Sequence, residues 1–307
     1  MKTNIFKNSF FASFLAIFCC ALWGVSTPIV KLGYEHVDAD HIPSLILWAG
    51  LQFAVAGIIT VVFYSIIKKR FVLPKRKNLF GIAQISLLQT VLQYAFVYVG
   101  LKFTTSVKGA VLKSTDVFFI IIISSFIFKL EKLTLRKLIS CIVGFLGIII
   151  VNLKGLEFNF SPLGDGFIIL AMIFYSLSVI LTGIYSKDED PLTLCGYQMA
   201  FGGLVLTVFG VIFGGSIKLF DMLPIIICLS LIYAVSYSLW TVLLKYNSAS
   251  KISINSFMTP IFGVLASFVL LNEKDAVSPL NLMLALILVC VGIIMWGISD
   301  KKGEEKL

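Results

Sequence analysis

Two charged residues, Lys113 and Asp116, interrupt a stretch of sequence that is otherwise almost entirely apolar. Asp116 lies close to the middle of the apolar segment 105–128, where an ionised side chain in a membrane helix costs about 2.5–3.5 kcal/mol. Residues three apart share one face of a helix. We expect the pair to face a wet cavity, where it binds a zwitterion or relays a proton. The alternative is a mutually neutralised structural ion pair, with Lys113 reaching outward toward the lipid headgroups.

Aromatic and amide side chains supply further binding candidates. Gln93, Tyr94 and Tyr98 fall in one apolar segment, and Tyr233, Tyr237 and Trp240 in another. Their rings are suited to lining a cavity and stacking on a ligand. The alternatives are helix packing and, for Trp240 near a segment end, an interfacial aromatic belt. Weaker polar candidates, which could instead bond neighbouring helices, are Trp23, Ser26, Tyr175, Ser176, Asn255 and Ser256. The predicted substrate-binding set is Lys113, Asp116, Gln93, Tyr94, Tyr237, Trp23, Ser26, Tyr175 and Asn255.

Signatures of enzymes and metal sites are missing from the sequence. Its two histidines, His36 and His41, lie in one polar loop, and none of its six cysteines forms a Cys-x-x-Cys pair. The LGDG at 163–166 has Pro162 where an intramembrane aspartyl protease has the first glycine of its GxGD motif. We therefore predict no enzyme activity, no metal and no cofactor.

The elements that must position these residues are membrane helices. The chain is 59% hydrophobic and 13% charged, whereas soluble domains carry roughly 25% charged residues. In lipid each apolar segment must be helical, because an open strand leaves backbone groups unpaired. The sequence thus predicts an all-α integral membrane protein with ten transmembrane helices. They are expected at 10–30, 42–67, 79–101, 105–128, 135–152, 164–186, 191–215, 222–245, 250–271 and 279–298.

The distribution of Lys and Arg predicts the orientation. With the N-terminus in the cytoplasm, 18 of these residues fall in inner segments and six in outer ones, as the positive-inside rule requires. Both termini, including a tail at 299–307, are then cytoplasmic, and we expect a bacterial plasma membrane. The basic run 68–77 is a topology signal, so the net charge of +9 does not indicate nucleic-acid binding. The acidic loop 187–190 fits this orientation least well.

The two halves of the chain resemble each other. Glu131-Lys132 and Glu273-Lys274 each follow an apolar segment, at an offset of 142 residues, and each precedes a segment with a Gly-Ile-Ile run. The halves, 10–152 and 164–298, each hold five spans, so the second enters the membrane from the opposite side. Secondary transporters commonly use such inverted repeats, with the substrate site near the midplane between them.

Two stretches carry a family resemblance. ALWGVSTPIVK (21–31) and MTPIFGVLASFVLLNEK (258–274) resemble the EamA-type pattern of the drug/metabolite transporter superfamily. The resemblance covers about 13–152 and 164–298. It implies ten helices in a 5 + 5 inverted arrangement and the transport of small solutes such as amino acids, nucleotide precursors, sugars or drugs. The sequence departs from the pattern at Phe118, the counterpart of Pro260, so it does not support gating by a proline break in that helix.

The preferred hypothesis is a secondary transporter, an exporter or exchanger, of a small organic metabolite such as an amino acid, working by alternating access. Its predicted partners are the solute and the lipid bilayer, and the sequence sets no oligomeric state. One alternative is a multidrug exporter of lipophilic cations, with Asp116 as the attracting anion. Lys113 argues against it by cancelling that charge. Another alternative is a membrane scaffold or receptor without transport, which needs neither inverted halves nor buried charges.

Overall fold

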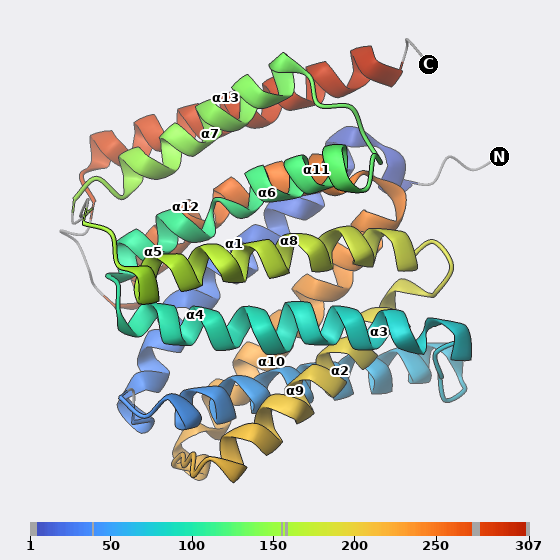
Figure 1. Ribbon diagram of the computed structural model, residues 1–307, viewed down its shortest axis with the longest axis vertical. Helices are drawn as coiled ribbons and strands as arrows, with labels where there is room; N and C mark the ends of the chain where they lie inside the picture. The colour runs from blue at the N-terminus through green and yellow to red at the C-terminus, as the bar shows by residue number, and fades with distance from the viewer. Residues whose placement is uncertain (1–4, 39, 155, 157–158, 272–276, 305–307) are drawn as a thin grey trace.

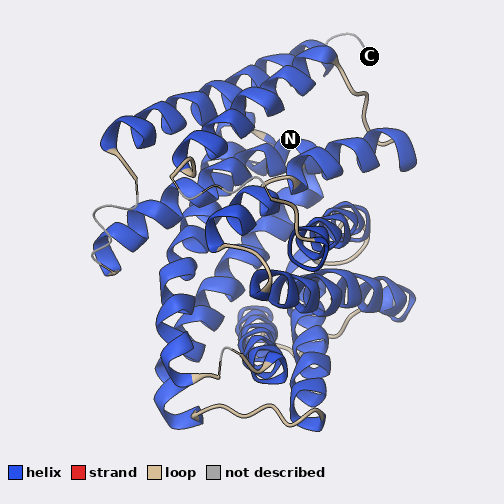
Figure 2. Ribbon diagram, turned by 60° about the vertical axis from the view of Figure 1, so that its left-hand side comes forward, coloured by secondary structure: helices blue, strands red, loops and turns tan. Residues whose placement is uncertain are grey.

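The computed structural model describes residues 5–38, 40–154, 156, 159–271 and 277–304, and these form long helices lying side by side (Figure 1). Within these ranges there is no strand (Figure 2), and Val37 and Ile217 form an isolated bridge. Nine helical segments of the described chain are long and apolar enough to cross a membrane. The remaining predicted span, α7 (Leu135–Val151), has 17 residues, which is near the lower limit for crossing a bilayer. The predicted all-α membrane fold is confirmed.

The first five spans follow the predicted boundaries closely. Short 3-10 turns η1 (Ile5–Lys7), η2 (Tyr34–His36) and η3 (Arg76–Asn78) flank them. The first two spans are α1 (Ser9–Gly33) and α2 (Ile42–Lys68). The third is α3 (Leu79–Ile85), the π-helical segment η4 (Ser86–Leu92) and α4 (Gln93–Lys102). The fourth is α5 (Ser106–Lys113), α6 (Asp116–Ile122) and the π-helical segment η5 (Ile123–Ile127), and α7 is the fifth.

The last five spans also lie close to the predicted segments. The sixth is the π-helical segment η6 (Pro162–Gly166) and α8 (Phe167–Tyr185). The seventh and eighth are α9 (Pro191–Ile212) and α10 (Leu219–Tyr246). The ninth is α11 (Ala249–Ser253), the 3-10 segment η7 (Ile254–Phe257) and α12 (Met258–Leu270), and the tenth is α13 (Pro279–Glu304). Glu273 and Lys274, from the predicted repeat, lie outside the described residues.

Helix pairing follows a twofold pattern. The second span packs on the seventh and the fifth on the tenth, at opposite edges of the bundle (Figure 1). The first span packs on the eighth and ninth, and the sixth packs correspondingly on the third and fourth. Glycines allow the closest approach, since a Cβ at Gly203 or Gly57 would overlap the backbone of the facing helix at Ala54 or Ala200. Each contact of a span in the first half is therefore matched by a contact of the corresponding span in the second half, five spans later in the chain.

The fourth and ninth spans are both interrupted. In the ninth, the 3-10 segment η7 precedes Pro260, which has no N–H to donate to the preceding turn. In the fourth, the turn lies at Ser114 and Thr115, which the offset of 142 places opposite Ser256 and Phe257. The Ser114 and Thr115 hydroxyls donate to the carbonyls of Ala110 and Leu112, at 3.1 and 2.6 Å. Such back-bonding bends helices, so this span is interrupted without a proline.

Helix α1 begins and helix α13 ends at the same end of the bundle (Figure 1). The acidic loop that fitted the charge rule poorly packs against the basic run 68–77. Asp188 pairs with Lys77 at 2.7 Å, and Glu189 accepts the backbone N–H of Lys75 at 2.8 Å. Its acidic residues are thus matched by basic neighbours from the other half of the chain.

Candidate functional site

Aromatic rings from both halves meet in one cluster inside the bundle. Trp23 of α1 lies 5.2 Å from the ring of Tyr237 and 4.9 Å from that of Trp240, both on α10. The hydroxyls of Tyr94, on α4, and Tyr237 are 3.3 Å apart. Three of the predicted residues, Trp23, Tyr94 and Tyr237, are therefore neighbours across the interface between the halves.

Phe53 of α2 is a member of this cluster that sequence reasoning missed. Its ring lies 4.5 Å from Tyr94 and stacks on Tyr233 at 5.1 Å. The sequence carries no signal for it, because Phe53 sits in an uninterrupted apolar span among 27 phenylalanines. Gln93, at the start of α4, is buried, and its side-chain oxygen has no hydrogen-bond partner.

Trp240 does not lie in an interfacial aromatic belt, which was one of the predictions for it. A tryptophan in an interfacial belt keeps one end in the polar headgroup layer, but Trp240 is only 2% exposed and packs on Trp23. The belt interpretation is therefore wrong, because α10 turns this face toward the other half of the chain rather than toward lipid. Ser26, one turn along α1 from Trp23, is buried and donates to the Trp23 carbonyl at 2.7 Å.

Asp116 begins α6 and is buried, with 6% of its surface exposed. Its carboxylate accepts the N–H of Val117 at 2.8 Å, and its own carbonyl accepts the Ser176 hydroxyl at 3.2 Å. Tyr175 of α8 lies close enough to interact electrostatically with this carboxylate. The backbone of Asp116 is thus bonded to α8, of the second half, while its carboxylate accepts a hydrogen bond within α6.

Lys113 does not pair with Asp116. None of the ion pairs found between described residues joins these two side chains. The span turns at Ser114 and Thr115, and Lys113 is exposed while Asp116 is buried. The interpretation as a mutually neutralised ion pair is therefore wrong, and the carboxylate charge is not cancelled by this lysine.

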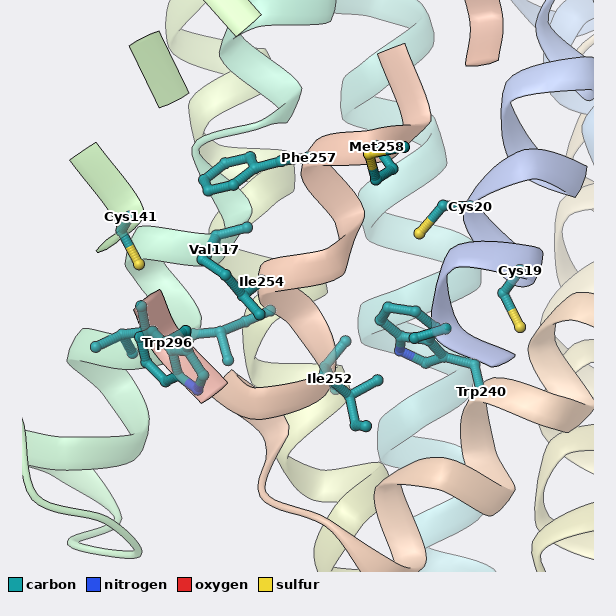
Figure 3. Close-up of a cluster of buried hydrophobic side chains, with 14 of the residues drawn as sticks. Cys19, Cys20, Val117, Cys141, Trp240, Ile252, Ile254, Phe257, Met258 and Trp296 are labelled. Atoms are coloured by element: carbon teal, nitrogen blue, oxygen red, sulfur yellow. The ribbon is translucent and has the colours of Figure 1, made fainter. Parts of the chain in front are cut away.

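Several buried polar atoms of the first, eighth and ninth spans have no hydrogen-bond partner. Asn255 of η7 is fully buried and donates to the Ile252 carbonyl at 2.9 Å, while its side-chain oxygen is unpaired. The Ser256 hydroxyl and the indole N–H groups of Trp23 and Trp240 are also unpaired. Buried polar groups are normally hydrogen-bonded, so these unpaired atoms make the region a candidate site for a polar ligand or water. Figure 3 shows the buried hydrophobic cluster that includes Val117, Trp240 and Met258, with Cys20 of α1 drawn between Met258 and Trp240 in this view.

Cys20 of α1 ties this region to the ninth span. Its thiol donates to the backbone carbonyl of Asn255 at 3.2 Å. The first span thereby holds the interrupted part of the ninth span in place, close to Asp116 of the fourth. Among the described residues no three His, Cys, Asp or Glu side chains come close enough together to hold a metal ion.

The EamA-like transporter family matches residues 10–153 and 162–298, which together make up most of the chain. The chain belongs to the EamA-like transporter family. The family match and the apolar helices together make it a multi-span membrane protein. In this EamA-like chain the aromatic cluster draws rings from both matched segments, with Trp23, Phe53 and Tyr94 in the first and Tyr237 and Trp240 in the second.

Relatives support this assignment at low identity. The chain is 26% identical over 210 residues to an uncharacterized transporter of Methanothermobacter thermautotrophicus, covering 66% of this chain and 61% of that one. A WAT1-related chloroplastic protein of Arabidopsis thaliana is 27% identical, covering 73% and 57%. The aligned region thus spans about three fifths of the length of these two relatives. The uncharacterized transporter YoaV of Bacillus subtilis is 23% identical, covering 89% and 92%.

A solved crystal structure has the same fold. It superposes with a TM-score of 0.78 at 15% identity, covering 95% of this chain and 99% of the other. At that identity the likeness concerns the fold alone.

Proposed function

We propose that this EamA-like transporter is a secondary transporter, an exporter or exchanger, that moves a small organic metabolite such as an amino acid by alternating access. The observation that carries the proposal is a buried carboxylate, Asp116, whose neighbour Val117 belongs to the same buried cluster as Trp240, between two five-span halves. The halves 10–152 and 164–298 act as inverted repeats, with the solute held between them.

The chemistry of the region suits a solute that carries an amine. Within the described parts of the chain no ammonium group pairs with Asp116, so the ammonium group of a solute can supply one. The rings of Trp23 and Tyr237 offer π-faces to the rest of the solute or to its cation. The unpaired groups of Asn255 and Gln93 are available to its polar atoms. Lys113, which is exposed, is available to a carboxylate.

The second candidate, an exporter of lipophilic cations, gains from the same geometry. The argument against it was that Lys113 cancels the charge of Asp116, and the two do not pair. An unpaired carboxylate beside aromatic rings suits a cation that has no carboxylate of its own. The two candidates differ in whether the solute needs Lys113.

Transport by the purified protein in liposomes tests the proposal. A panel of labelled amino acids and of lipophilic cations is offered to the wild type, and the transported solute is then offered to Asp116→Asn. We expect Asp116→Asn to reduce transport at least about tenfold, because the lost charge–charge contact is worth over one kcal/mol. Asp188→Asn, which removes an exposed carboxylate outside the bundle centre, is the matched control and is expected to transport normally.

Lys113→Met separates the two candidates. Loss of amino acid transport in this variant supports a zwitterionic solute, while unchanged transport of a cation supports the second candidate. Normal transport by Asp116→Asn would remove this carboxylate from the mechanism. Binding to a protein partner without flux of any solute would instead favour the scaffold or receptor alternative.

A further inference from the structure

Asp165, at the start of the sixth span, is fully buried and bonded to the other half of the chain. One carboxylate oxygen accepts the Thr104 hydroxyl at 2.7 Å. The other lies 2.5 Å from the Lys108 ammonium and accepts the backbone N–H of Ser161 at 2.8 Å. The side chains of Lys108 and Asp165 are 12% and 1% exposed. A buried ion pair thus closes the gap between the fourth and sixth spans.

Glu131, just after the fourth span, occupies a comparable place at the opposite end. Its carboxylate accepts the hydroxyl of Ser250, from the second half, at 2.5 Å. It also accepts the Ser124 hydroxyl at 2.8 Å and pairs with the Lys137 ammonium at 3.2 Å. Lys137 lies over the ring of Trp296 at 4.9 Å. Here the Glu131–Lys137 ion pair lies within the first half, and contacts with Ser250 and Trp296 link it to the second.

Both clusters sit at the first turn of an interrupted span. Lys108 is in the first turn of α5 and Ser250 in that of α11. Figure 1 shows α5 and α11 at opposite ends of the bundle. Each cluster therefore joins the two halves of the chain where an interrupted span begins, on either side of the aromatic cluster.

Such contacts suit surfaces that must separate repeatedly. A buried ion pair contributes little net stability compared with apolar packing, yet removing one partner is strongly destabilising. When the two surfaces part, the charged and hydroxyl groups are hydrated, whereas an apolar seal would expose hydrocarbon to water. Closing the path with polar contacts therefore defines the closed geometry, and it keeps the free energies of the closed and open states similar.

We propose that these clusters are two latches that alternately release opposite ends of the transport path. The first latch is Asp165 with Lys108 and Thr104, and the second is Glu131 with Ser250. The proposal rests on the alternating-access function proposed above. The latch residues are positioning residues, because they hold the closed geometry and do not touch the solute.

Distances between spin labels across each latch test the proposal in the full-length protein in lipid nanodiscs. The native cysteines are replaced by alanine, and one label pair is placed at Phe103 and Phe160 and another at Lys132 and Ala249. We expect Asp165→Asn to raise the population of long distances across the first pair at least about tenfold, without lengthening the second. Ser250→Ala should lengthen the second pair alone, because it leaves the ion pair of Glu131 intact.

Two further variants keep the test sharp. Thr104→Val leaves the Lys108–Asp165 ion pair in place and should act like Asp165→Asn, but more weakly. Asp188→Asn breaks an exposed ion pair and should change neither distance distribution. Folding of each variant is checked by its elution profile and its melting temperature.

Unchanged distances in folded Asp165→Asn and Ser250→Ala proteins would overturn the proposal. Lengthening of both pairs together in either variant would also overturn it, since that indicates general loosening. The latches can succeed or fail independently of the proposed function. Latch opening without flux of any solute would leave the latches standing and remove the transport proposal, and flux with immobile latches would do the reverse.

Discussion

Asp116 and Asp165 are both buried carboxylates, and their different surroundings assign them different roles. Asp165 has an ammonium and two hydrogen-bond donors, so its negative charge is fully compensated in the closed protein. Asp116 has an N–H donor but no ammonium within ion-pair distance. An uncompensated buried charge is costly, so Asp116 is the carboxylate that gains most from a cationic solute. The two carboxylates are both buried, so it is their hydrogen-bond and ion-pair partners that distinguish the proposed solute-binding group from the proposed latch residue.

Stability should respond to Glu189 more than to its neighbour Asp188. Glu189 is 4% exposed and accepts the Lys75 N–H and the Asn78 side-chain amide at 2.8 and 3.0 Å. Glu189→Ala leaves these donors unpaired, and each buried unpaired donor costs about 1–3 kcal/mol. We expect the melting temperature in detergent to fall clearly for Glu189→Ala. An unchanged melting temperature would mean that water replaces the carboxylate at no cost.

The control for this prediction, Asp188→Asn, should melt close to the wild type at neutral pH, because exposed ion pairs contribute little. The hydrogen bond from Lys77 lowers the pKa of Asp188 below its ordinary value. A lowered folded-state pKa means that the contact stabilises the protein above the unfolded pKa of about 3.9. This stabilisation is lost as the pH falls through the lower folded-state pKa, so the small difference from wild type should vanish in strong acid.

Among the elements, the interrupted fourth and ninth spans each carry one of the candidate site residues. Asp116 starts the second part of the fourth, and Asn255 lies within η7 of the ninth. Discontinuous helices at corresponding positions of two repeats are a structural pointer to a transporter's binding site. The breaks have different local causes, a proline in one and serine and threonine back-bonds in the other. The position of the break is thus shared by the halves, while the residues that produce it differ.

The close packing of α2 against α9 should require glycine at position 203. A Cβ at Gly203 would overlap the backbone at Ala54, so Gly203→Ala must push the two helices apart. Overpacking of this kind typically costs about 1–3 kcal/mol, and we expect a lower melting temperature. Gly297→Ala is the matched control, since nothing lies within 4 Å of its Cβ position and alanine favours a helix. Equal effects of the two substitutions would contradict close packing at Gly203.

At the scale of the whole molecule, charge and helix pairing agree on how the chain is arranged. The start of α1 and the end of α13 share one end of the bundle with the basic run 68–77 (Figure 1). Loops rich in Lys and Arg stay in the cytoplasm. We therefore propose that both termini are cytoplasmic, in a bacterial plasma membrane.

Reporter fusions test this orientation. Green fluorescent protein, which is fluorescent when it folds in the cytoplasm, is fused after Leu307, and alkaline phosphatase, active outside it, is fused in the loop at Gly215. We expect a fluorescent C-terminal fusion and an active phosphatase fusion. The opposite pattern in both would reverse the orientation and exchange the sides of the two proposed latches.

The sequence by itself was enough to determine the spans and the membrane fold. A run of about 20 apolar residues has to be a helix in lipid, so the described helices begin and end within a few residues of the predicted limits. The candidates Trp23, Tyr94 and Tyr237 were also found from the sequence, because large polar aromatic residues stand out within apolar spans.

Only the tertiary structure decided which of these residues meet. Sequence spacing placed Lys113 with Asp116, but the turn at Ser114 and Thr115 separates them, so this lysine is not the counter-ion of the carboxylate. Phe53 and the partners of Asp165 could not be found from spacing, because they come from helices far apart in the sequence. The period of a helix determines which of its residues share a face. Which residues of other helices contact that face depends on how the ten helices pack together.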